Sequence, residues 1–216
     1  MPPVLERRHV RYMKKSIVLL AGYPGTGKSY LMDIIKKRYP QFVIVSPDEF
    51  KEMMWDRYGF ANLKEKEECI EKAWKAYYEA MEKHMKQGVS MLSDYPFSIK
   101  QKDRIQELAE RYDFQIITIR LIADLDVLYE RQRKRDLDPT RHPGHIVGSY
   151  HVGMTLHNRE EQPCMVPYEE FMNRCKNRGY GTFSLGTLLK EVDVSDFDKV
   201  DYTELMQELA EKLQEE

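Results

Sequence analysis

No run of apolar residues in this 216-residue chain approaches the roughly 20 that a membrane-spanning helix needs. The first 15 residues, MPPVLERRHVRYMKK, also lack the apolar core of a secretory signal. The chain has only three cysteines, at scattered positions, which argues against a disulfide framework and fits reduced thiols. We therefore expect a cytoplasmic protein that does not insert into a membrane.

A surplus of positive charge is missing as well. The formal net charge is −2, whereas proteins that bind extended nucleic acid usually carry a clear basic surplus or stripe. An N-K-x-D segment, with which GTPases read guanine, does not occur. The sequence therefore does not support a long polynucleotide ligand, and it favours ATP over GTP as a bound nucleotide.

Short apolar runs alternate with amphipathic segments along the chain. We expect strands at 16–20, 42–45, 89–92 and 114–122, and a last short strand in KEVDVS near residue 190. Amphipathic helices of ten or more residues separate them, the longest from 64 to 86. Strands joined by such helices form a parallel sheet with right-handed crossovers. We predict a three-layer α/β/α fold with a five-stranded parallel sheet and a helical lid.

The length of the chain supports one sizeable core, so residues 15–216 are predicted to form a single domain. Residues 1–14 carry four lysines or arginines against one glutamate and lack periodicity, and we expect a loose extension there. The pattern weakens from Leu137 to Gly181, and we interpret about 131–181 as a lid that covers the substrate. Four histidines of this region match no zinc motif: His142, His145, His151 and His157. The first two belong to RHPGH, which is better interpreted as a lid turn.

The stretch AGYPGTGKSY, residues 21–30, follows directly on the apolar run SIVLL. Gly22, Gly27, Lys28 and Ser29 complete the pattern G-x-x-x-x-G-K-[ST] between a predicted strand and a predicted helix. Glycine permits backbone angles that let successive N–H groups converge on phosphates, and the helix N-terminus adds partial positive charge. We predict a phosphate-binding P-loop (Walker A motif). The alternative is a glycine-rich turn with an exposed lysine.

Each residue of this loop has an expected contact with a nucleotide. Lys28 is expected to reach the β and γ phosphates, and the Ser29 hydroxyl to bind Mg²⁺. The predicted nucleotide-binding residues are Gly22, Pro24, Gly25, Thr26, Gly27, Lys28, Ser29 and Tyr30.

Two aspartates follow neighbouring predicted strands. Asp48 comes three residues after FVIV, and Asp94 comes two residues after VSML. Ligands of open parallel sheets collect at the carboxyl ends of the strands, so one aspartate is assigned as a general base and the other to the metal or the acceptor. The alternative for Asp48 is a helix N-cap, and for Asp94 a turn residue before Tyr95 and Pro96.

Arginines four residues apart in ERQRKR are a further candidate feature. Arg131 and Arg135 are expected on one face of a helix, where guanidinium groups could stabilise a transferring phosphoryl group. The alternative is a solvated helix face. Arg141, in the turn RHPGH, is expected to contact the substrate or the nucleotide phosphates.

These segments together resemble a known family. IVLLAGYPGTGKSYL, VIVSPDEFKEMM, GVSMLSDYPFS and VLYERQRKR are similar to P-loop kinases related to bacteriophage polynucleotide 5′-hydroxyl kinase and the zeta toxins. The resemblance spans residues 15–136 and the closing VDVSDFDKVDY, whose loop in related kinases lies near the adenine. It implies a nucleotide-kinase-like fold, Asp48 as general base, Asp94 on the metal and acceptor side, and Arg131 and Arg135 over the phosphoryl group.

The chain departs from this family at two places on the acceptor side. Lys51 stands where the polynucleotide kinases have arginine, and Tyr95 and Pro96 stand where they usually have threonine and asparagine. We expect Lys51, Asp94 and Arg141 to contact the acceptor. The sequence thus predicts an ATP- and Mg²⁺-dependent phosphotransferase acting on a hydroxyl of a small-molecule or nucleotide-like substrate. The alternatives are a polynucleotide 5′-hydroxyl kinase and a nucleotide-dependent switch ATPase.

Overall fold

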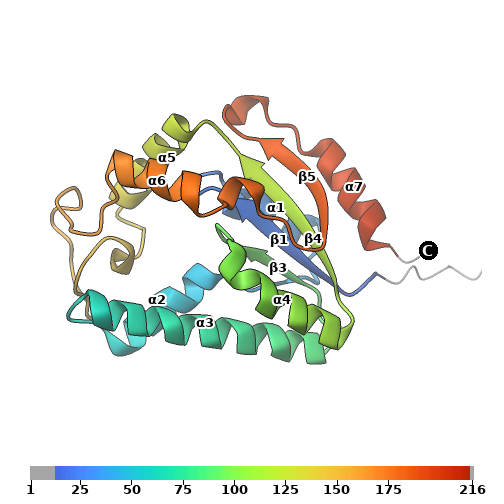
Figure 1. The fold of residues 1–216 in the computed structure, drawn as a ribbon, viewed down its shortest axis with the longest axis horizontal. Helices are drawn as coiled ribbons and strands as arrows, with labels where there is room; N and C mark the ends of the chain where they lie inside the picture. Colours follow the sequence, from blue (N-terminus) through green and yellow to red (C-terminus); the bar gives the residue numbers. More distant parts are fainter. Residues whose placement is uncertain (1–12, 215–216) are drawn as a thin grey trace, which may run out of the picture.

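The computed structural model describes residues 13–214 of the chain (Figure 1). Within that range, five strands form one sheet: β1 (Ser16–Gly22), β2 (Val43–Ile44), β3 (Met91–Asp94), β4 (Gln115–Ile122) and β5 (Thr187–Asp193). The helices are α1 (Lys28–Arg38), α2 (Pro47–Tyr58), α3 (Leu63–Lys86), α4 (Ile99–Tyr112), α5 (Leu125–Leu137), α6 (Tyr168–Asn177) and α7 (Thr203–Leu213). Short 3-10 turns occupy Pro143–His145, Tyr180–Thr182 and Phe197–Lys199.

The sheet is parallel throughout, with the strand order β2-β3-β1-β4-β5. The first strand is therefore central, and β3 and β4 flank it. Leu20 of β1 pairs with Asp94 of β3, so the carboxyl ends of these two strands lie next to each other. This is the edge at which parallel sheets collect their ligands.

Both faces of the sheet are covered. Ile17 and Leu19 of β1 pack with α3 and α4, whereas Val18 and Leu20 pack with α1 and α7. Successive side chains of a strand point to opposite faces, which explains why all seven residues of β1 are buried. Figure 1 shows α3 and α4 together on one side of the sheet and α7 on the other. The predicted three-layer α/β/α fold with a five-stranded parallel sheet is confirmed.

Several local predictions are wrong in detail. The second strand pairs over only two residues, because Ser46 already caps α2 and Pro47, which has no N–H to pair, begins the helix. The predicted third strand at 89–92 lies two residues later, so Asp94 is its last residue. Helical spacing would group Tyr30 with the apolar residues Leu31 and Ile35 of α1, but Tyr30 is 65% exposed whereas the other two are buried.

The weakly patterned region after α5 consists of a long connection followed by α6. The connection packs over α2 and α3 through Ile146 and Val147, and an isolated bridge joins Phe60 to Tyr150. Helix α6 packs on α5, and Figure 1 shows these two helices near the loop that enters α1.

Residues 1–12 of the predicted extension lie outside the described residues. Its last two residues are not loose, because Met13 forms a bridge with Gln214 and the Lys14 N–H donates to the Leu213 carbonyl. Within residues 13–214, no helix combines the length and the apolar character needed to cross a bilayer.

Candidate functional site

The glycine-rich loop between β1 and α1 has the backbone of an anion-binding turn. Gly25 and Gly27 have φ angles of 83° and 75°, in the left-handed region that glycine adopts readily. Gly27 is the N-cap of α1, so the free N–H groups of the first helical turn border the loop. Gly22 serves packing instead, because a β-carbon there would lie 1.9 Å from the carbonyl oxygen of Leu121 in β4.

Lys28 is folded back into this loop rather than exposed. Its side-chain Nζ donates to the Tyr23 carbonyl at 2.6 Å and lies 3.4 Å from the Gly22 carbonyl. Burial lowers the pKa of Lys28 to about 8. The buried ammonium group is thus hydrogen-bonded to neutral carbonyl oxygens. Phosphate oxygens bound at the loop would supply the negative charge that these carbonyls do not.

Ser29 and Asp94 form the second polar pair of the site. The Ser29 hydroxyl donates to Asp94 Oδ2 over 2.8 Å, and Asp94 Oδ1 is buried with no hydrogen-bond partner among the described residues. A hydroxyl and a buried carboxylate are the oxygen ligands that Mg²⁺ prefers, so this pair fits a magnesium ion. Asp94 ends β3, and the alternative that it is a turn residue is therefore wrong.

Asp48 lies in the first turn of α2, with Ser46 as the N-cap, so the N-cap alternative for Asp48 is wrong. Its Oδ1 atom accepts a hydrogen bond of 2.9 Å from Lys51 Nζ. The same Nζ donates to the Tyr95 hydroxyl, also at 2.9 Å. The two departures from the polynucleotide kinase pattern, at residues 51 and 95, are thus in contact with each other. Lys51 is thus placed to position Asp48, and its predicted contact with an acceptor stays a prediction, because an ammonium group has three N–H donors and two are used here.

The surroundings of Asp48 keep it ionised. Burial acts against the charged form, but Lys51, His145 and Arg135 outweigh burial and hold the pKa of Asp48 well below its usual range. The pKa of Lys51 is raised, because its contacts with Asp48 and Tyr95 outweigh the burial that acts to lower it. At neutral pH the pair is therefore a carboxylate and an ammonium group.

Arg131 and Arg135 of α5 differ in their contacts. Arg131 donates to the carbonyl oxygens of Val194 and Ser195 at 2.7 and 2.9 Å, and its guanidinium carbon lies 3.7 Å from the ring centroid of Phe197. Arg135 forms no hydrogen bond or ion pair within residues 13–214. Both arginines line the cavity described below, but Arg131 is hydrogen-bonded to the loop after β5, so its predicted contact with the transferring phosphoryl group stays a prediction, whereas Arg135 is free for that role.

Two histidines of the lid turn contact acidic side chains of α2. His145 Nε2 lies 2.7 Å from Glu52 Oε1, and His142 Nε2 lies 3.1 Å from Asp56 Oδ1. Arg141 forms a buried ion pair with Asp136, with 2.8 Å between Nε and Oδ1. Among residues 13–214, no group of three or more His, Cys, Asp or Glu side chains is arranged to hold a metal ion.

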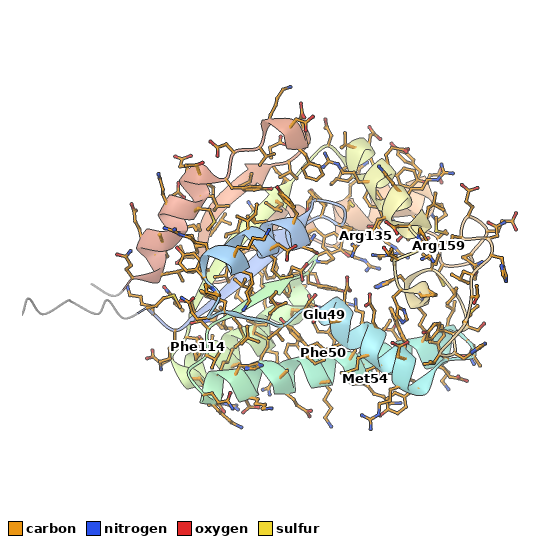
Figure 2. All side chains as sticks on the ribbon, turned by 180° about the vertical axis from the view of Figure 1, so that it is seen from behind. Glu49, Phe50, Met54, Phe114, Arg135 and Arg159 are labelled. Atoms are coloured by element: carbon orange, nitrogen blue, oxygen red, sulfur yellow. The ribbon has the colours of Figure 1, made fainter. Side chains whose placement is uncertain are left out.

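These groups surround one cavity of about 630 Å³ between the glycine loop, α2, α5 and α6. The predicted site residues that line it are Pro24, Gly25, Gly27, Lys28, Ser29, Asp48, Lys51, Asp94, Arg131, Arg135 and Arg141. Figure 2 labels Arg135 on α5 and Glu49 on α2, of which Arg135 lines the cavity and Glu49 does not.

Three predicted nucleotide-binding residues are not part of the lining, namely Gly22, Thr26 and Tyr30. Gly22 fits against β4, and the Thr26 hydroxyl donates to the Tyr23 carbonyl inside the loop. The Tyr30 side chain is exposed on α1, and its predicted contact with a nucleotide stays a prediction.

Further lining residues were not assigned to the site from the sequence, among them Gln132, Asp136, Phe171, Arg174, Arg178 and Tyr180. The last four carry no motif, because they come from α6 and the turn that follows it. Phe197 also lines the cavity and belongs to VDVSDFDKVDY, the segment expected near the adenine. Only the packing of α6 on α5, through Phe171 and Leu128, brings the C-terminal residues of α6 to the glycine loop.

Comparison with known proteins agrees with this architecture. A family model described as an AAA domain matches residues 17–150. The chain is similar to a candidate kinase from Chloroflexus aurantiacus, with a TM-score of 0.70, 22% identity, and coverage of 93% of this chain and 97% of that chain. It is also similar to a chain of the Pnkp1/Rnl/Hen1 RNA repair complex, with a TM-score of 0.50, 14% identity, and coverage of 84% and 50%. These likenesses show a shared P-loop kinase fold. No curated protein sequence matches the chain.

Proposed function

Since the chain belongs to the AAA domain family, we propose that it is an ATP- and Mg²⁺-dependent phosphotransferase whose acceptor is a hydroxyl of a small-molecule or nucleotide-like substrate. One observation carries this proposal: the carboxylate of Asp48 lines the same cavity as Lys28 of the glycine loop and the unpaired Arg135. A site that only bound a nucleotide would not need an ionised, positioned carboxylate facing its phosphates.

The nucleotide is proposed to lie along the glycine loop. Backbone N–H groups at Gly25 and Gly27 and the ammonium group of Lys28 would bind its phosphates. The base would lie beside the loop, where Arg131 covers the ring of Phe197, whose side chain is 46% exposed and lies next to Gly27. This placement matches the expectation that the loop following the last strand lies near the adenine.

Magnesium would be held on the Ser29 and Asp94 side. Asp94 Oδ1, which is buried without a partner, is the oxygen available to the ion or its water shell. When bound, Mg²⁺ would neutralise part of the charge of the β and γ phosphate oxygens.

The chemical step follows from the position of Asp48. The acceptor hydroxyl would donate a hydrogen bond to the Asp48 carboxylate, and its oxygen would form a bond to the γ phosphorus. The bond from that phosphorus to the β–γ bridging oxygen breaks, ADP leaves, and the acceptor proton passes to Asp48. The low pKa of Asp48 makes it a weak base, which suits a loose transition state in which orientation matters more than early proton removal. Arg135 would stabilise the charge of the transferring group.

Label transfer from γ-labelled ATP to a panel of hydroxyl compounds tests the function. The panel includes sugars, nucleosides, nucleotides, hydroxy acids and an oligonucleotide with a 5′-hydroxyl. We expect a labelled product from at least one small acceptor, with MgCl₂ required. Release of labelled phosphate alone, with every acceptor unlabelled, would favour the switch ATPase. Transfer to the oligonucleotide alone would favour the polynucleotide kinase.

A further inference from the structure

The cavity carries more positive charge than a magnesium-bound nucleotide requires. Of the described residues that line it, seven are lysine or arginine and three are aspartate, which leaves a surplus of four positive charges. A triphosphate brings about four negative charges, and one Mg²⁺ neutralises about two of them. Positive charge therefore remains for a second anionic group.

Five of the seven lysines and arginines that line the cavity already have a partner or a proposed role. Lys51 and Arg141 each form an ion pair with an aspartate of the cavity. Three others lie at the proposed nucleotide subsite: Lys28, Arg131 and Arg135. The remaining two are Arg174, in the last turn of α6, and Arg178, which follows directly on that helix.

Arg178 has no carboxylate in ion-pair contact within residues 13–214. Its Nη1 atom lies 3.4 Å from the hydroxyl of Tyr180, a neutral and buried residue of the lining. The hydrogen bond to Tyr180, with smaller effects of Tyr95 and Glu170, raises the pKa of Arg178. Arg178 lines the same cavity as Tyr95, whose hydroxyl accepts from Lys51, the partner of Asp48, and we assign this part of the lining to the acceptor.

Arg174 lies four residues earlier and therefore on the same side of α6. It pairs with Glu170, an exposed residue that is not part of the lining. An arginine at a helix C-terminus can serve only to offset the helix dipole. Offsetting the helix dipole would not by itself require both Arg174 and Arg178 to line the cavity. The other acceptor-side cations, Lys51 and Arg141, are already paired with aspartates.

We propose that Arg178, assisted by Arg174, binds an anionic group of the phosphoryl acceptor, either a phosphate or a carboxylate, while the acceptor hydroxyl faces Asp48. A guanidinium fork matches the oxygens of both groups in a bidentate geometry. This inference rests on the proposed phosphotransferase function and narrows its acceptor to an anionic hydroxyl compound.

Calorimetry with two simple probes tests the subsite. Protein saturated with Mg²⁺ and a non-hydrolysable ATP analogue is titrated with inorganic phosphate and, separately, with malonate. We expect at least one probe to bind in the millimolar range, and the affinity to fall about tenfold or more in Arg178→Ala. Arg178→Lys, which keeps the charge but not the fork, should lose less. Binding of phosphate alone assigns a phosphorylated acceptor, and binding of malonate alone assigns a carboxylate.

Lys176→Ala is the matched control, because it removes one positive charge from an exposed position of the same helix. It should bind both probes as the wild type does. If neither probe binds the analogue-saturated protein, or if Arg178→Ala and Arg178→Lys both bind as the wild type does, the inference is overturned while the phosphotransferase proposal stands. Failure of the ATP analogue itself to bind contradicts the proposed function, and the inference with it. Thermal unfolding of each variant separates a lost subsite from a lost α6.

Discussion

Lys51 Nζ lies 2.9 Å from Asp48 Oδ1, and both residues belong to the first turns of α2. The exposed fractions of the two side chains are 11% and 29%, so the ion pair is largely shielded from water. We predict that Lys51→Met lowers the free energy of unfolding by about 2 kcal/mol at neutral pH, because it leaves a partly buried carboxylate without its cation. Lys83→Met, on an exposed part of α3, should have little effect.

The sign of the pH dependence follows from the two pKa shifts. The depressed pKa of Asp48 gives stability that is present above the ordinary carboxyl pKa and lost as the pH falls through the folded-state value. The raised pKa of Lys51 gives stability that is fully present below the ordinary lysine pKa and is lost as the pH rises through the folded-state value. The stability difference between wild type and Lys51→Met should therefore shrink in acid, as urea unfolding at several pH values can measure. The acid limb of turnover should also move to higher pH in the variant, and an unmoved limb would contradict the positioning role of Lys51.

Asp48→Asn tests the carboxylate directly. Asparagine keeps the size of the side chain but cannot take a proton, so we expect turnover to fall about a hundredfold or more, with the affinity for the ATP analogue nearly unchanged. Asp103→Asn, an exposed aspartate of α4, serves as the control for the same chemical change. Steady-state kinetics with the acceptor found by label transfer gives the comparison, and equal turnover of Asp48→Asn and wild type would remove Asp48 from the mechanism.

The lowered pKa of Lys28 should make the affinity for a nucleotide depend on pH. Because burial lowers the pKa of Lys28 to about 8, the ammonium charge is lost above that pH in the free protein. The affinity for the magnesium complex of an ATP analogue should therefore fall as the pH rises from about 7 to about 9. Lys28→Arg keeps its charge over this range, so its weaker binding should be nearly independent of pH. Calorimetry measures both, and a flat wild-type profile would contradict the assignment.

The two arginines of α5 should give different kinetic defects. Arg135→Ala is expected to lower kcat about a hundredfold or more with little change in the affinity for ATP, since Arg135 is free to act on the transferring group. Arg131→Ala should instead weaken ATP binding and lower Tm, because it removes the hydrogen bonds to the carbonyls of Val194 and Ser195. Arg133→Ala, on the exposed side of the helix, is the control. Identical defects in both variants would show that the two arginines share one role.

The parts of the site that local patterns encode could be predicted from the sequence. The glycine loop follows from a motif between a strand and a helix, and Asp94 follows from the position at which a buried strand ends. Helical spacing placed Arg131 and Arg135 on one face, but spacing gives no information about the carbonyls of Val194 and Ser195, which lie some 60 residues away in sequence. The contact of Arg131 with these carbonyls could therefore not be predicted.

The acceptor side depends on tertiary contacts in the same way. The sequence showed that residues 51 and 95 depart from the family pattern, but not that Lys51 and Tyr95 contact each other. Arg178 and Tyr180 lie in a segment with little periodicity, and they reach the cavity only because α6 packs on α5. Patterns at fixed spacing cannot report such contacts.

A crystal structure with Mg²⁺ and a non-hydrolysable ATP analogue would test the central claim most directly. The account predicts that the phosphates lie along the backbone at Gly25 and Gly27, with Lys28 at the terminal phosphate and that phosphate directed at the carboxylate of Asp48. A terminal phosphate directed away from Asp48, or an analogue bound outside the glycine loop, would contradict it.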